Sequence, residues 1–103
     1  MPLPVRLHPE VEAEYADAAL YYHDQSAAVG ANFVDLVDRT LAGIGESPYQ
    51  SPTWPDDPRV RKRVLARFPY AVFYAVRADA VLVLAIEHAK RRPGTWLSRV
   101  SAP

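Results

Sequence analysis

The sequence predicts one α+β domain in which a hairpin of two helices packs on one face of a small, mostly antiparallel sheet. Three observations predict it. Residues 9–44 carry apolar side chains at helical spacing in two consecutive segments, and residues 60–86 carry them at the spacing of strands. The chain has 103 residues, half of them hydrophobic, which suits a single core. We expect one domain over residues 1–103, in the order β-α-α-β-β-β with a short C-terminal tail.

The first strand and the first helix meet at a proline. Apolar side chains alternate over residues 3–7, which is the period of a short strand, and Pro4 places that strand at a sheet edge or marks the start of the strand. Pro9 suits the first turn of a helix. The apolar stripe of this helix continues to about Asp24 and consists of Val11, Tyr15, Ala18 and Tyr22.

A second helix follows directly, because Ser26 has the side chain of a helix N-cap. Its stripe consists of Val29, Phe33, Val37, Thr40 and Ile44. Gly45 is a natural stop, and Pro48 prevents the helix from continuing. Residues 46–58 contain four prolines, so we expect a stiff loop there.

Three strands are expected after this loop. The first alternates over residues 60–68 and ends at Pro69. The other two, Tyr70–Val76 and Val81–Ile86, are apolar on both faces, which is typical of central strands. We expect the helices to cover one side of the sheet. The core should then contain Tyr15, Phe33, Val37, Val72, Tyr74 and Leu84, or their strand neighbours.

Charge is distributed unevenly between the two halves of the chain. Residues 1–58 hold ten carboxylate side chains and two cations, whereas residues 59–103 hold ten cations and two carboxylates. The basic half is a candidate surface for an anionic partner. The alternative is that the two halves neutralise each other across the fold.

The densest basic segment is Arg59–Arg67. On one strand, Arg61, Arg63 and Arg67 would share a face, with ~6.6 Å between alternate residues, which approximates the phosphate spacing of a single nucleic-acid strand. Arginine also grips phosphate with two hydrogen bonds. The alternative is a solvated strand face that protects a sheet edge.

His88 is the best candidate for proton transfer. It follows the last strand and precedes three cations, so it could act in phosphodiester cleavage; the alternative is a histidine at the rim of the core. Glu87 should point to the opposite face of the strand, so the two residues form no dyad. Trp96 could complete the core or stack on a ligand. The cations are Lys90, Arg91 and Arg92.

Several classes of function are excluded or disfavoured. The chain has no cysteine, which excludes disulfides, thiolate metal sites and a cysteine nucleophile. The histidines lack metal-ligand spacing, and the glycines form no phosphate loop, so we expect no metal and no cofactor. Apolar runs such as Ala80–Ile86 are too short to span a bilayer. We expect a cytoplasmic protein without a membrane partner.

Two segments give the sequence a family resemblance. The run RFPYAVFY over Arg67–Tyr74 and the run VLAIEHAKRRPGTW over Val83–Trp96 resemble the RelE/ParE toxin superfamily of bacterial type II toxin–antitoxin modules. His8-Pro-Glu, Tyr21-Tyr22 and Ser47-Pro48 fit the same pattern. The resemblance implies a growth-arresting toxin, the two-helix fold predicted above, and a cognate antitoxin as partner.

The resemblance implies one of two cellular targets for the toxin. RelE-like toxins cut mRNA on the ribosome, whereas ParE-like toxins block DNA gyrase and need no catalytic residues. Ala71 stands where RelE-like nucleases commonly carry arginine, and their C-terminal tyrosine is absent. We therefore expect the ParE-like activity. In the alternative, an mRNA endoribonuclease, the catalytic residues would be His88, Arg91, Lys62 and Arg63.

The binding surface is expected on the basic half. The target or the antitoxin would contact Arg61, Arg63, Arg67, Lys90, Arg91, Arg92 and Trp96. An antitoxin would place acidic residues on these cations and apolar anchors in a groove beside the helices. A further alternative is a non-toxic basic module that binds nucleic acid.

Overall fold

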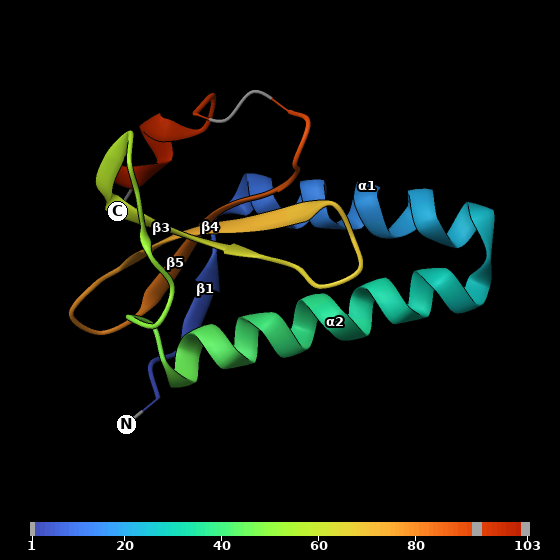
Figure 1. Cartoon of the computed structure of the whole chain (residues 1–103), viewed down its shortest axis with the longest axis horizontal. Helices are drawn as coiled ribbons and strands as arrows, with labels where there is room; N and C mark the ends of the chain where they lie inside the picture. The colour runs from blue at the N-terminus through green and yellow to red at the C-terminus, as the bar shows by residue number, and fades with distance from the viewer. Residues whose placement is uncertain (1, 92–93, 102–103) are drawn as a thin grey trace.

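The computed structural model describes residues 2–91 and 94–101, which form two helices packed on a five-stranded sheet (Figure 1). The predicted α+β fold is therefore confirmed. Arg92, one of the expected contact residues, lies outside the described residues. The elements are β1 (Val5–Leu7), α1 (Pro9–Gln25), α2 (Ala27–Glu46), β2 (Thr53–Trp54), β3 (Asp57–Val64), β4 (Tyr70–Val76), β5 (Val81–His88) and a 3₁₀ helix, η1 (Leu97–Ser101).

The sheet has the strand order β1-β5-β4-β3-β2. The N-terminal strand lies at one edge, which is one of the two alternatives that Pro4 indicates, and runs parallel to β5, with Val5 opposite Val81. The other neighbouring strands are antiparallel. The two strands with apolar residues on both faces, β4 and β5, lie inside the sheet, as predicted.

Each face of the sheet has its own core, which explains why these two strands are apolar on both faces. The helix-side core contains Val11, Ala18, Phe33, Val37, Ile44, Leu65, Val72, Tyr74, Val81, Val83 and Ile86. The far-side core contains Trp54, Val60, Ala71, Phe73, Ala75, Leu84, Ala85, Trp96 and Val100. Leu84 itself packs on the opposite face, and its strand neighbour Val83 takes the expected place beneath the helices. Tyr15 is only partly buried, at the margin of the helix-side core.

The C-terminal segment covers the far face. Trp96 is 1% exposed, and its indole donates a hydrogen bond to Glu87 Oε1 at 3.0 Å. Of the two alternatives for Trp96, completing the core or stacking on a ligand, the structure agrees with the first, because this residue lies in the far-side core. Arg99 reaches around β5, donates to the Leu84 carbonyl at 2.8 Å, and forms ion pairs with Glu10 and Glu14 of α1. These contacts fasten the tail to the first helix.

Two expected boundaries differ in the structure. The proline-rich loop contains the short strand β2, and β3 ends at Val64 instead of continuing to Phe68. The chain turns there because Phe68 packs into the helix-side core, with its ring centre 5.1 Å from that of Phe33. Arg67 adopts a left-handed conformation with φ 69° in this turn. The expected row of three arginines on one strand is therefore a pair, without Arg67.

The residues at the two ends of α2 were predicted with different success. The Ser26 hydroxyl caps the helix as predicted, accepting a hydrogen bond from the Val29 amide at 3.4 Å. The helix continues past Gly45 to Glu46, so this glycine is not a stop signal. A Cβ at Gly45 would lie 2.8 Å from the Leu3 carbonyl oxygen, so glycine is needed where the helix approaches the N-terminal segment closely. Among the described residues, no helix is long and apolar enough to cross a membrane.

Candidate functional site

The candidate residues meet at one end of the sheet. The β3–β4 turn and the end of β5 are neighbours there, because Tyr70 pairs with His88 and the Ala89 amide donates to the Pro69 carbonyl at 2.6 Å. Arg67 and Arg91 flank this end from the two segments. Cations that are far apart in the sequence are thus brought to one edge of the molecule.

Arg61 and Arg63 point toward the helix side, where they hold the loop after α2. Arg61 Nη1 donates to the Ser51 carbonyl at 2.6 Å and to the Tyr49 carbonyl at 3.2 Å. Arg63 Nε donates to Ser51 Oγ at 2.7 Å. Because these donors are already engaged within the chain, the two guanidinium groups fix the loop to β3. Neither a row free for phosphate nor a solvated strand face describes these contacts, and a role of the two arginines in binding a target or antitoxin stays a prediction.

The nuclease candidates are only partly brought together. Lys62, His88 and Arg91 line one small cavity of about 30 Å³ on the far side, and the Lys62 ammonium lies 5.6 Å from the centre of the Phe73 ring. Arg63 belongs to the opposite face of β3, because residues 62 and 63 alternate across the sheet. Three of the four expected residues therefore border one cavity, but the His88 ring itself packs against Tyr70 on the helix side.

Glu87 is the site residue that sequence reasoning missed. Its carboxylate lines the same small cavity, is 5% exposed, and accepts the hydrogen bond from Trp96. Burial raises the pKa of this carboxyl group, while the Trp96 hydrogen bond and the charge of Arg91 act in the opposite direction. The sequence signal that could have identified Glu87 as a site residue is a carboxylate at the end of an otherwise apolar strand.

His88 faces away from Glu87, as predicted, because the two residues pair with successive residues of β4. Its ring packs edge-on against Tyr70, with 5.3 Å between ring centres, and its Nδ1 accepts a hydrogen bond from the Lys90 amide at 3.0 Å. His88 also lines a cavity of about 390 Å³ between α1 and the end of β5, which includes Tyr21 and Arg91. Burial raises the pKa of Tyr70 there.

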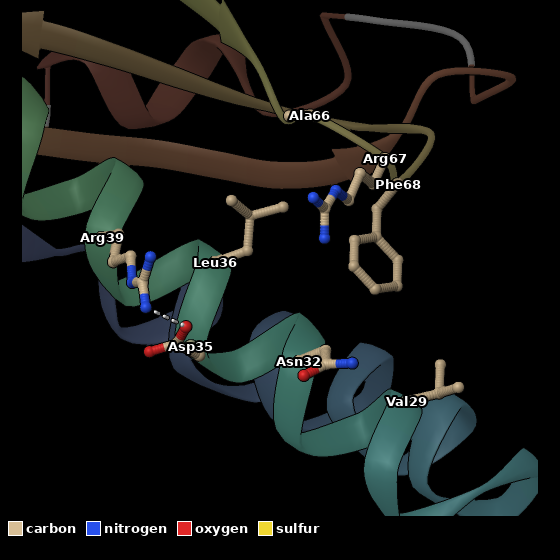
Figure 2. A pocket seen from close by; sticks show the side chains of 8 residues that line it. All are labelled: Val29, Asn32, Asp35, Leu36, Arg39, Ala66, Arg67 and Phe68. Carbon is tan, nitrogen blue, oxygen red and sulfur yellow. Dashed lines mark ion pairs between the residues drawn. The ribbon is translucent and has the colours of Figure 1, made fainter.

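A further cavity, of about 360 Å³, lies between α2 and the β3–β4 turn (Figure 2). It is lined by Val29, Asn32, Asp35, Leu36, Arg39, Ala66, Arg67 and Phe68. The Arg67 side chain extends from the turn toward the helix, and Arg39 forms an ion pair with Asp35 at 3.0 Å. We call this space the α2–turn cavity.

Comparison with known proteins identifies the family. The family model described as the ParE toxin of the type II toxin–antitoxin system parDE matches residues 5–93. The chain belongs to the ParE toxin family. It is the toxin component of a type II toxin–antitoxin system, so the superfamily resemblance read from the sequence is confirmed. ParE toxins inhibit DNA gyrase, and their systems pair the toxin with a cognate ParD antitoxin.

A solved structure supports the ParE fold independently. A chain described as the chromosomal ParDE TA system from P. aeruginosa superposes with a TM-score of 0.73, covering 84% of this chain and 95% of that one, at 16% sequence identity. At that identity the likeness concerns the fold alone. No curated protein matches the sequence.

Proposed function

We propose that this ParE toxin arrests growth in the cytoplasm by blocking DNA gyrase through surface contact, without cleaving RNA. The observation that supports the proposal is that the nuclease candidates are divided between the two faces of the sheet. The Lys62 ammonium lies over the Phe73 ring on the far side, whereas the His88 ring packs against Tyr70 on the helix side. Cleavage would require a cation and a proton carrier to reach the same phosphate.

The contact surface proposed for the target is the basic end of the sheet. Lys90 and Arg91 are exposed just after β5, and Arg67 is exposed in the adjacent turn. Gyrase carries bound DNA, which is negatively charged. A cationic surface on the toxin is therefore attracted to the complex of gyrase with DNA. Contact of this kind needs no residue that exchanges a proton.

RNA cleavage on the ribosome stays as the second candidate. The observation that favours it is that Lys62, His88 and Arg91 all border one cavity, although the His88 ring points to the helix side. A partner opening this cavity would be required. A non-toxic nucleic-acid-binding module is the remaining alternative, and the family match opposes it.

Expression of the toxin without its antitoxin tests these proposals. We expect growth arrest, loss of negative supercoiling in plasmid DNA, and intact mRNA. Lys90→Glu/Arg91→Glu should abolish the arrest, whereas His88→Ala should weaken it only modestly. Arg6→Glu is the control, because it reverses the charge of an exposed side chain away from the basic end. Ribosome-dependent mRNA cleavage that disappears in His88→Ala would overturn the proposal.

A further inference from the structure

The carboxylate of Glu14 on α1 has one oxygen with a hydrogen-bond partner and one without. Arg99 Nη2 donates to Oε2 at 2.7 Å, and the Glu14 side chain is 23% exposed. Glu14 Oε1 is the one buried side-chain nitrogen or oxygen atom without a hydrogen-bond partner in the part of the chain that the structure describes. A buried acceptor left unsatisfied destabilises a fold, so a donor is expected beside this oxygen.

Glu87 reaches the same space from β5. Both residues line the cavity of about 390 Å³ between α1 and the end of β5. Glu87 is 5% exposed, and its Oε1 accepts the hydrogen bond from Trp96. A carboxylate can only accept hydrogen bonds, whereas a protonated carboxyl group also donates one. Glu87 can therefore supply the missing donor for Glu14 Oε1 when it carries a proton.

The surroundings of Glu87 favour its protonated form. Burial is the largest cause that raises the pKa of Glu87, and the negative charge of Glu14 raises it further. The Trp96 hydrogen bond and the charges of Arg91 and Arg99 lower this pKa but leave it above its ordinary value. The titratable and charged side chains around Glu87 are Glu14, Asp17 and Tyr21 of α1, Lys62 of β3, Tyr70 of β4, His88 at the end of β5, Arg91 just after it, and Arg99 of η1.

We propose that Glu14 and Glu87 share one proton, in a hydrogen bond that joins α1 to β5 and makes the attachment of the C-terminal segment sensitive to pH. The same two carboxyl groups hold Arg99 and Trp96, so one proton links α1, β5 and the tail. Loss of the proton leaves a second negative charge beside Glu14, buried against Trp96. Opening of the tail brings water to that charge, so the closed state binds the proton more tightly than the open state. Opening therefore becomes more frequent as pH rises.

Titration of the glutamate carboxyl groups by carbon-13 NMR tests the shared proton, with Glu87→Gln used to assign the Glu87 signal. Glu87 should titrate above the ordinary range of glutamate. Glu14→Gln should return the Glu87 midpoint toward that range, because it removes the neighbouring negative charge. Glu12→Gln is the matched control, since it neutralises an exposed carboxylate of the same helix and should leave the midpoint unchanged. A Glu87 midpoint in the ordinary range, or one that Glu14→Gln does not move, would overturn the proposal.

Deuterium exchange of the Trp96 indole N–H tests the attachment of the tail and needs no variant of Glu14. Protection is the ratio of the intrinsic to the observed exchange rate. In the wild type it should fall at least about fivefold as pH rises through the Glu87 midpoint. Glu87→Gln keeps an amide donor toward Glu14 at every pH, so its protection should stay within about twofold over the same range. Equal pH profiles for the two proteins would overturn the proposal. Neither measurement involves gyrase, so this inference and the proposed function can fail separately.

Discussion

Replacing Phe33 with alanine removes the side chain at the centre of the helix-side core. Phe33 is 0% exposed, and its ring lies among four other aromatic rings, which come from α1, the β3–β4 turn and the start of β4. The ring centres are 4.9 Å away for Tyr22, 5.1 Å for Phe68, 5.3 Å for Tyr70 and 6.2 Å for Tyr15. No neighbour can fill the space without leaving this cluster.

The expected loss is large for a domain of this size. Truncation of a buried phenylalanine costs about 3–5 kcal/mol, through lost transfer free energy and the cavity left behind. A domain of this kind has roughly 5–15 kcal/mol of total stability. Because 1 kcal/mol shifts the melting temperature of a small domain by about 4–8 °C, Phe33→Ala should lower it by at least about 12 °C.

Thermal unfolding followed by circular dichroism measures this difference. The matched control is Leu20→Ala, which also truncates an apolar helical side chain but at a position that is 57% exposed. We expect the control to change stability by less than about 0.5 kcal/mol. A soluble Phe33→Ala variant with the melting temperature of the wild type would refute the assignment of this core.

Three further predictions concern individual side chains. Because burial raises the pKa of Glu87 above its ordinary value near 4.5, the protonated form is favoured in the folded state. Wild-type stability should therefore fall relative to Glu87→Gln as pH rises through that pKa, measured by urea unfolding across pH. Arg99→Ala should cost about 2 kcal/mol, because it removes charged hydrogen bonds to Glu14 and the Leu84 carbonyl; equal urea midpoints would contradict this. Arg67→Gly should gain about 1 kcal/mol by relieving the left-handed backbone, and a lower melting temperature would exclude that strain.

Local patterns predicted most of the fold. The apolar periodicity of residues 9–44 and the cap at Ser26 involve residues that are close in the sequence. Both helices could therefore be predicted from the sequence. The edge position of β1 was one of the two alternatives that Pro4 indicated. The two-residue strand β2 has too few residues to show a period, and it was missed. The end of β3 was misplaced because the alternation continues into residues 65–68, where contact with Phe33 bends the chain.

The site depended on contacts between distant segments. The spacing of Arg61 and Arg63 in the sequence indicated a row of cations on one strand face. Their hydrogen bonds, however, go to a loop ten or more residues earlier in the chain, and composition cannot reveal contacts of this kind. Glu87 acquires its role only when the tail folds back and places Trp96 against it. The α2–turn cavity likewise exists only where the helix and the turn meet, although a groove beside the helices was expected.

Supercoiling by purified gyrase is the most direct measurement of the central claim. Relaxed plasmid, gyrase and ATP are incubated with the refolded toxin, and the topoisomers are separated on a gel, while translating ribosomes with a defined mRNA are treated with the same preparation. The account predicts that supercoiling is inhibited by the wild type and by His88→Ala but not by Lys90→Glu/Arg91→Glu, and that the mRNA stays intact. Uninhibited gyrase together with mRNA cut by the wild type but not by His88→Ala would contradict it.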